Sequence, residues 1–180
     1  TLNARWRDEA EARGREYKPV RLGIGLNTGL CCVGNLGSET RFDYSVIGDN
    51  VNIASRLEGQ SKTYDVGTVV GESTTARAPD FAFLELDLLK VKGKTEATRV
   101  FALLGDSALK ASQSFIALTE RHREFLNRYR ARDWDAAEIL SRECEKLNSS
   151  RLDRLYALYR ERIARFLVNP PPPDWDGSAE

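Results

Sequence analysis

The sequence predicts an α+β protein, in which an antiparallel-rich sheet carries helices on one face and a purely helical segment follows. Three observations lead to this prediction. Up to about residue 106, short runs of β-branched, leucine and aromatic residues alternate with glycine-containing turns, as strands do. Helical patterns separate these runs. Beyond residue 106, alanine, leucine, arginine and glutamate recur at helical spacing. We therefore expect three parts: residues 1–106, a helical extension at 107–168 and a proline-rich tail at 169–180.

The composition is that of a globular protein without a dominant charge. Hydrophobic residues make up 41% of the 180 residues, and 27 Lys and Arg balance 27 Asp and Glu. This balance gives no global field to attract nucleic acid or an acidic membrane, so a nucleotide site would have to be local. The sequence shows neither a long apolar run nor a signal peptide. We expect no membrane segment within this chain and a cytoplasmic location, although a region outside it could anchor the protein.

The cysteines and the histidine do not suggest a metal site. Cys31, Cys32 and Cys144 lack metal-ligand spacing and fit a reducing compartment, so we expect all three to be small packing residues. The single histidine, His122, lies in a charged helical run. Because one histidine cannot form a metal cluster, we expect a solvated surface residue.

The first elements are a helix and a hairpin. Residues 1–15 are rich in alanine, arginine and glutamate and predict a surface helix. Leucine and isoleucine separated by glycines predict a strand at 22–26. The turn at 27–29 then leads into a second strand at 30–33, so the two strands are expected to pair as a hairpin.

Another strand and a helix follow the hairpin. Phe42, Tyr44 and Val46 alternate with polar residues, which predicts a strand with these three on its buried face. Asp49 is expected to cap the helix that begins there. The buried side of that helix would consist of Val51, Ile53, Ala54 and Leu57. Further strands are expected at 68–70, 81–86, 88–92 and 99–104, with a capped helical turn at 71–78.

The helix after Asp49 contains residues that packing does not explain. Asn50 and Asn52 are poor helix formers, each costing roughly 0.5 kcal/mol against alanine. Asn52 and Arg56 are four residues apart, so their side chains share one face. The guanidinium of Arg56 is a permanent cation with a planar fork of donors, which suits phosphate oxygens. The alternative is a solvated polar stripe of Asn52, Arg56 and Gln60.

The string DYSVIGDNVNIASRLEG at 43–59 closely resembles the substrate-binding segment of class III adenylate and guanylate cyclase catalytic domains. The similarity continues upstream through GIGLNTGLCCVGNLGS and downstream through the turn VKGK at 91–94, in the family's order. The resemblance implies most of a ferredoxin-like cyclase fold, without its opening strand-helix-strand segment.

The resemblance also implies roles for individual residues. In this family the asparagine and arginine of the helix act on the transition state of cyclisation, which implies catalytic roles for Asn52 and Arg56. The lysine of the downstream turn holds the triphosphate, and by position this is Lys92, with Lys94 as the second candidate. Such cations suit the chemistry, because attack of a ribose hydroxyl on the α-phosphorus spreads negative charge onto phosphate oxygens.

The cofactor and the base are inferred in the same way. The family uses two Mg²⁺ or Mn²⁺ ions, whose aspartate ligands would lie upstream of Thr1, so no metal ligand is expected within this chain. Asp43 is assigned to the surroundings of the base pocket. Ser45 lies where adenylate cyclases often carry aspartate or threonine and guanylate cyclases carry cysteine. We therefore expect adenine, although a hydroxyl can serve either purine.

Two classes of function follow. The first is part of an adenylate cyclase of intracellular signalling, which converts ATP to 3′,5′-cyclic AMP and pyrophosphate as a homodimer with two shared sites. Guanylate cyclase is the alternative within this class, and the chain alone is expected to be inactive. The second is a non-catalytic regulatory module that binds a nucleotide or a protein partner on a cyclase scaffold.

The helical extension is expected to contain three helices, at 109–131, 134–147 and 151–168. Its run YRARDWDAAEILSRECEKL resembles part of a tetratricopeptide repeat. One such repeat cannot bury its own face, so it should pack on the preceding domain, on a protein partner or on another helix. The prolines of the tail exclude a helix and favour an extended segment. This tail is either disordered or docked through Trp175.

Overall fold

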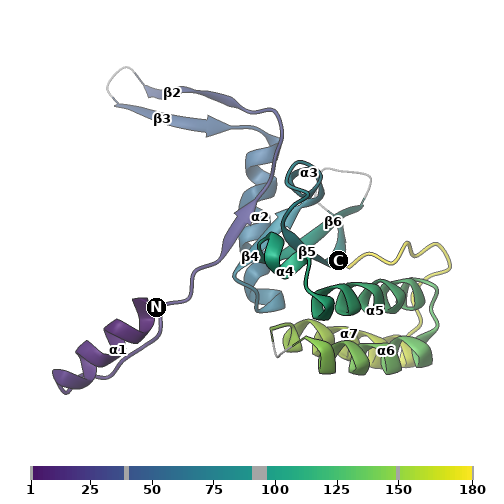
Figure 1. Ribbon diagram of the computed structural model, residues 1–180. Coiled ribbons are helices and arrows are strands. Elements are labelled where there is room, and N and C mark those ends of the chain that lie inside the picture. Colours follow the sequence, from purple (N-terminus) through teal and green to yellow (C-terminus); the bar gives the residue numbers. More distant parts are fainter. Residues whose placement is uncertain (1, 39–40, 91–96, 149–150, 180) are drawn as a thin grey trace.

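The computed structural model describes residues 2–38, 41–90, 97–148 and 151–179. A body of sheet and helices forms the centre, from which β2 and β3 project as a ribbon, while α1 lies apart (Figure 1). No helix within these ranges is both long and apolar enough to span a membrane. The elements are α1 Leu2–Ala12, β1 Ile24–Leu26, β2 Cys32–Ser38, β3 Arg41–Ile47, α2 Asp49–Tyr64, β4 Thr68–Gly71, α3 Glu72–Thr75, β5 Ala82–Lys90, β6 Ala97–Gly105, α4 Ser107–Lys110, α5 Gln113–Arg130, α6 Trp134–Leu147 and α7 Asp153–Val168.

A four-stranded sheet with the order β1-β4-β6-β5 lies at the centre of the body. β1 and β4 are parallel, whereas β4–β6 and β5–β6 are antiparallel. With the antiparallel β2–β3 ribbon, this confirms the predicted α+β, antiparallel-rich architecture. In β6, Val100 and Ala102 point to the same face and are buried, whereas Arg99 points to the other face and is exposed. One face of the sheet therefore carries the core.

The predicted hairpin between 22–26 and 30–33 is wrong. β1 pairs in parallel with β4, and the chain from Cys32 onward pairs with β3 instead. A parallel pair needs a crossover connection, which here consists of the β2–β3 ribbon and α2. The partner of β1 therefore lies more than one element away, beyond the range of a turn signal.

The β2–β3 ribbon has the expected strand character but not the expected burial. Tyr44 is 78% exposed and Val46 is 40% exposed, so they do not form a buried face. The side chain of Phe42 lies outside the described part. Alternation predicted the strand correctly, but the ribbon projects from the body and leaves these side chains exposed (Figure 1). Cys31 and Cys32 are likewise exposed, so the prediction that they are packing residues is wrong.

A single strand replaces the two expected at 81–86 and 88–92. β5 changes its register against β6 between Glu85 and Asp87. Such a bulge places an extra residue in one strand and breaks the alternation, which explains the apparent gap in the sequence pattern. Residues 91 and 92 lie outside the described ranges.

α2 lies where the sequence predicted it and uses nearly the predicted face. Its buried residues are Ile53, Leu57, Ser61 and Tyr64. Val51 and Ala54 are partly buried. The predicted cap is wrong, because the N-cap residue is Gly48 and Asp49 is the first residue of the helix. Gly48 has a φ of 145°, which favours glycine, and the carboxylate of Asp49 interacts favourably with the helix dipole.

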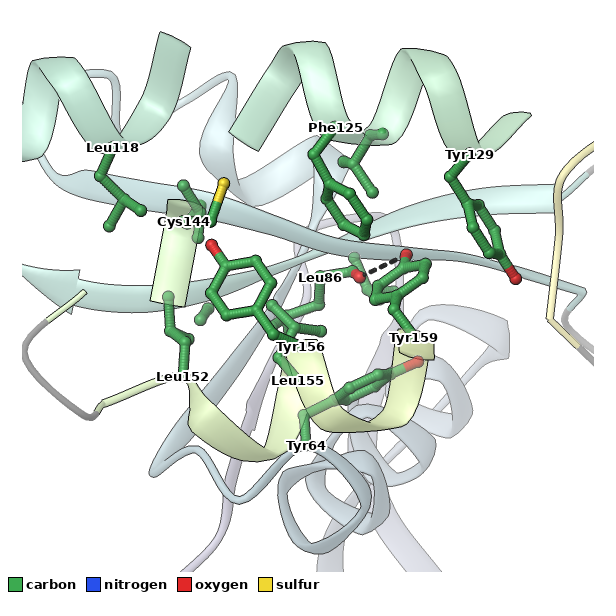
Figure 2. Close-up of a cluster of buried hydrophobic side chains, with 14 of the residues drawn as sticks. Tyr64, Leu86, Leu118, Phe125, Tyr129, Cys144, Leu152, Leu155, Tyr156 and Tyr159 are labelled. Atoms are coloured by element: carbon green, nitrogen blue, oxygen red, sulfur yellow. Dashed lines mark hydrogen bonds between the residues drawn. The ribbon is translucent and has the colours of Figure 1, made fainter. Parts of the chain in front are cut away.

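The three predicted helices of the extension are present as α5, α6 and α7. The side chains of Asp106, Ser112 and Asp133 cap α4, α5 and α6. The helices pack on each other and on the sheet through one buried apolar cluster (Figure 2). The cluster includes Leu57, Tyr64, Leu84, Leu86, Phe125, Tyr129, Cys144, Leu155, Tyr156 and Tyr159. Two of the neighbours expected for the extension, the preceding domain and other helices, are therefore its neighbours in the structure.

The tail contains no helix, as predicted, and of the two alternatives the structure shows the docked one. Trp175 is partly buried and packs against the apolar cluster of the helices. Its ring centroid lies 5.5 Å from that of Tyr129 and 5.2 Å from that of Phe166. The tail is thus part of the folded body.

His122 is buried, so the prediction of a solvated surface histidine is wrong. Its Nε2 lies 2.7 Å from the backbone oxygen of Glu85, and its Nδ1 lies 3.0 Å from the hydroxyl of Tyr156. A neutral ring satisfies both contacts, with Nε2–H donating to Glu85 and Nδ1 accepting from Tyr156. Burial lowers the pKa of His122 from its usual 6.5 to about 4.

This shift predicts that the protein loses stability as the pH falls from about 6.5 to about 4. The unfolded chain binds a proton at His122 in this range and the folded chain does not, so acid favours unfolding by up to about 3 kcal/mol. Urea unfolding at pH 7 and at pH 4.5 measures the loss. His122→Gln, which does not titrate, should lower stability at pH 7 but show a smaller further loss at pH 4.5. An equal acid loss in both proteins would contradict the assignment.

Candidate active site

Two asparagines fix the start of α2 to the loop that follows β1. The Nδ2 of Asn27 donates to the backbone oxygen of Asn50 at 3.2 Å and to its Oδ1 at 3.1 Å. The Nδ2 of Asn50 in turn donates to the backbone oxygen of Leu30 at 3.0 Å. A Cβ on Gly29 would lie 2.1 Å from the Asn50 amide, so this approach requires glycine. Asn50 is therefore structural, which explains one of the two poor helix formers.

The same loop is also bound to α3, and β1 directly contacts α2. The hydroxyl of Ser73 donates to Oδ1 of Asn27 at 3.1 Å and to the backbone oxygen of Thr28 at 2.8 Å. A Cβ on Gly25 would lie 2.0 Å from the backbone oxygen of Ala54, so strand and helix touch through their backbones. These contacts hold α2 in a defined position on the sheet.

Asn52 and Arg56 lie on the exposed side of α2. Both are exposed, whereas Ile53 and Leu57, each one residue further on, are buried. Residues four apart lie on the same face of a helix, so Asn52 and Arg56 form one exposed stripe on α2. The buried face of the same helix packs in the core. The amide of Asn52 and the guanidinium of Arg56 are therefore exposed to solvent on a helix whose position is fixed by its buried face.

Arg56 lines a pocket of about 270 Å³ between α2 and the sheet. Lys90, at the end of β5, provides a second cation in its wall. The lining residues are Ile53, Arg56, Leu57, Gln60, Gly71, Leu89, Lys90, Thr98 and Val100. A largely apolar pocket that Arg56 and Lys90 help to line suits a ligand that is flat or apolar at one end and anionic at the other.

The remaining predicted site residues do not join this pocket within the described part of the chain. Ser45 and Asp43 are exposed on one face of β3, in the projecting ribbon (Figure 1), and neither lines the pocket beside Arg56. Asn52 is not among its lining residues either. Lys92 and Lys94 lie outside the described residues. The structure thus brings Arg56 together with Lys90 and Gln60, and leaves the candidate base-binding residues on a separate element.

A buried ion pair supports α2 from behind, and the sequence analysis missed it. The Tyr64 hydroxyl at the end of α2 donates to Oδ2 of Asp87 at 2.8 Å, and Nη1 of Arg162 in α7 donates to the same oxygen at 2.5 Å. Burial raises the pKa of Tyr64, and the charge of Asp87 raises it further. Burial has the largest single effect on the pKa of Arg162 and would lower it, but the Asp87 carboxylate together with Tyr159 and Tyr64 raises this pKa overall. The signal in the sequence was Asp87, which with Glu85 is one of two acids within the otherwise apolar run of β5.

Comparison with known proteins identifies the family. The model of the adenylate and guanylate cyclase catalytic domain matches residues 5–105, more than half of the chain. The chain belongs to this family. The class III cyclase resemblance seen in the sequence is thereby confirmed.

Several characterised cyclases are similar to this cyclase-family chain. Adenylate cyclase 1 of Rhizobium meliloti is 35% identical over 86 residues, which cover 47% of this chain and 13% of that protein. The adenylate cyclase of Anabaena cylindrica is 38% identical over 86 residues, 46% of this chain and 17% of the relative. The chain thus spans less than a fifth of the length of these two relatives.

Solved cyclase structures are also similar to it. The adenylyl cyclase CyaB from P. aeruginosa is 32% identical, with a TM-score of 0.48, over 56% of this chain and 50% of that one. The guanylyl cyclase Cya2 is 27% identical, with a TM-score of 0.45, over 58% of this chain and 51% of that one.

Class III cyclases generally use divalent metal ions, and the described residues do not fit such ions. No group of three or more His, Cys, Asp or Glu side chains that could hold a metal occurs among them. Asp43 and Asp49 are both exposed, and neither belongs to such a group.

Proposed function

We propose that this chain is part of an adenylate cyclase that converts ATP to 3′,5′-cyclic AMP and pyrophosphate. In this proposal Arg56 stabilises the charge that develops on the α-phosphate and Asn52 orients the ribose. Lys92 holds the leaving pyrophosphate, with Lys94 as the second candidate. The observation that supports it most is the exposed Asn52 and Arg56 stripe on a helix fixed by buried neighbours. Groups held in place before the reaction stabilise developing charge without reorganising.

The proposed preference for adenine over guanine rests on Ser45. Its hydroxyl lies on an exposed face of β3 beside Asp43, where a purine could accept from it or donate to it. We expect a full-length protein containing this chain to prefer ATP over GTP, and Ser45→Ala to reduce that preference. Initial rates with each nucleotide, compared as kcat/KM, measure it. Asn35→Ala, at an exposed polar position of β2 opposite Tyr44, is the control for disturbance of the ribbon. A wild type that prefers GTP, or a Ser45→Ala variant with unchanged preference and rate, would reject the adenine assignment in favour of a guanylate cyclase or of a different base contact.

We further propose that the full-length protein is a homodimer. The β2–β3 ribbon supports this, because its apolar side chains are exposed in the single chain: Val33, Tyr44, Val46 and Ile47. Contiguous exposed apolar residues on a ribbon are typical of a protein contact. Light scattering that gives a strict monomer at high concentration would argue against it. We also propose that α5 and α6 form a tetratricopeptide-like pair of helices. Their exposed faces would then bind a further protein partner.

The second candidate is a nucleotide-binding or partner-binding module without turnover. It is favoured by the lack of a metal-ligand group among the described residues. For the chain alone we accordingly expect no cyclic AMP above a no-enzyme control in the presence of ATP and manganese, since phosphoryl transfer depends strongly on charge stabilisation. A mass-spectrometric assay for cyclic AMP tests this. Sustained production would show that these residues suffice for turnover.

A further inference from the structure

β5 is the edge strand of the sheet, and its outer backbone groups are bound by residues from the C-terminal third of the chain. His122 binds the backbone oxygen of Glu85 at 2.7 Å. The hydroxyl of Tyr159 donates to the backbone oxygen of Leu86 at 2.9 Å (Figure 2). The bulge at this point explains why two successive carbonyl groups are bound from the outer side. Residues of α5 and α7 thus bind the middle of this edge.

The tail covers the end of the same edge. Ala179 forms a parallel bridge with Leu89. Its N–H donates to the backbone oxygen of Leu88 at 2.8 Å, and its own oxygen accepts from the N–H of Lys90 at 3.5 Å. The tail therefore adds a minimal strand to the sheet next to the last described residue of β5. An edge strand bound in this way is fixed in position rather than open to other chains.

Trp175 anchors this segment to the helices. Besides Tyr129 and Phe166, its ring lies 6.0 Å from that of Trp134, and the guanidinium of Arg132 lies 5.8 Å from its centroid. The indole Nε1 donates to the backbone oxygen of Ser178 at 2.9 Å, which turns the chain back towards β5. An aromatic anchor of this kind offsets the conformational entropy lost when the tail is ordered.

Asp176 stabilises the turn between the anchor and the bridge. Its Oδ1 accepts from the N–H of Ser178 at 3.0 Å, and its Oδ2 lies 3.7 Å from Nζ of Lys90. Hydrogen bonds from Ser178 lower the pKa of Asp176, so it is charged at neutral pH. The tail therefore contacts Lys90 through both its backbone and its side chain.

The bound end of β5 is also a wall of the pocket beside Arg56. Leu89 and Lys90 line that pocket together with residues of α2 and β6. The same two residues thus contact the tail on the outer edge of the sheet and face the pocket that contains a candidate catalytic cation. A change in the tail can therefore alter the shape of the pocket through the end of β5 alone.

We infer that residues 175–179 act as a strap that fixes the end of β5, and that Trp175 and Ala179 are positioning residues for nucleotide binding beside Arg56. This inference rests on the proposed function only for the identity of the ligand. The contacts of the strap and their effect on the pocket wall are independent of it. A strap with a purely structural role would change the stability of the fold and leave nucleotide binding unchanged.

A matched pair of substitutions tests the strap. Ala179→Pro removes the N–H that donates to Leu88, whereas Ala179→Ser keeps it. Asp174→Ala, at an exposed position of the tail, is the control for a general change in the tail. Hydrogen exchange of the Lys90 amide and the methyl NMR shifts of Leu89 and Val100 are measured on this chain, without nucleotide. We expect Lys90 to exchange about tenfold faster or more in Ala179→Pro, with shifted methyl resonances, and both to remain near wild type in the other two proteins.

The functional measurement is made on a full-length protein that contains this chain. We expect Ala179→Pro and Trp175→Ala to raise KM for ATP by about fivefold or more with kcat changed by less than about twofold, since uniform binding is lost rather than transition-state binding. Ala179→Ser, which keeps the N–H, should have the same KM for ATP as the wild type. Unchanged Lys90 exchange in Ala179→Pro would overturn the strap. Faster exchange with an unchanged KM in an active enzyme would overturn its positioning role. A protein that neither binds nor converts ATP would reject the proposed function, while the exchange and methyl data would still decide on the strap.

Discussion

Replacing Arg56 by alanine in an active full-length protein should lower kcat by about 100-fold or more and change KM for ATP only a little. The guanidinium is proposed to contact the α-phosphate most strongly when charge develops there, and removing one such donor typically costs a factor of this size. Asn52→Ala should behave in the same way, because the ribose would lose its orientation at the moment of attack. Steady-state kinetics with ATP, at saturating metal, measures both parameters.

Two further variants make this result specific. Arg56→Lys keeps the charge but loses the planar fork of donors, so we expect it to recover only a small part of the rate. Lys62→Ala, at an exposed position on the same helix, should leave kcat unchanged within about twofold, since surface substitutions of this kind have small effects. A raised KM with unaltered kcat in Arg56→Ala would reject the transition-state role and leave ordinary substrate binding.

Replacing Arg162 by methionine should destabilise the fold by about 3–5 kcal/mol, the usual cost of leaving one partner of a buried ion pair without the other. Asp87 is only 1% exposed, so its carboxylate cannot regain solvation when the guanidinium is removed. The Tyr64 hydroxyl and the backbone N–H of Leu88 are its other donors, and neither carries a charge. Urea unfolding at pH 7, followed by circular dichroism, gives the change in free energy.

Matched control variants show whether the loss of stability comes from the burial of this ion pair or from the loss of any ion pair. Arg154→Met breaks an exposed pair with Glu161, which has a similar distance of 2.8 Å, and should cost less than about 1 kcal/mol. The double variant Asp87→Asn and Arg162→Met should recover much of the loss, because no charge is then buried alone. If Arg154→Met and Arg162→Met cost the same, the buried pair does not support α2 in the way described.

The sequence predicted the elements well where their signal is local. The helix at Asp49–Tyr64 and the three helices of the extension follow from spacing within a few turns, and the structure has them in place. The strand order could not be obtained in this way, because β1 pairs with a strand more than forty residues later, with Ile24 opposite Thr68. Turn residues at 27–29 favoured a hairpin, but their side chains and glycine serve the contact with α2 instead.

Burial was predicted less well than secondary structure, for a related reason. Alternation along β3 identifies an apolar face but contains no information on what covers it, and Tyr44 is exposed. His122 looked solvated and Asp87 received no role for the same reason, since their partners Glu85, Tyr156 and Arg162 come from other elements. For the candidate site, the sequence predicted the Asn52 and Arg56 stripe, whereas the role of Lys90 in the pocket wall became visible only in three dimensions.

The order in which the chain is synthesised gives the covered edge of β5 another consequence. The ribosome produces β5 first, and the three residues that bind its outer edge, His122, Tyr159 and Ala179, emerge only afterwards. Until then the nascent sheet has an open edge that can pair with a neighbouring chain. A transcript or protease product that stops shortly after residue 106 would keep the whole family-matched region and still be prone to aggregation. For expression, therefore, the boundary of a usable protein lies beyond the tail and not at the end of the region that the family model matches.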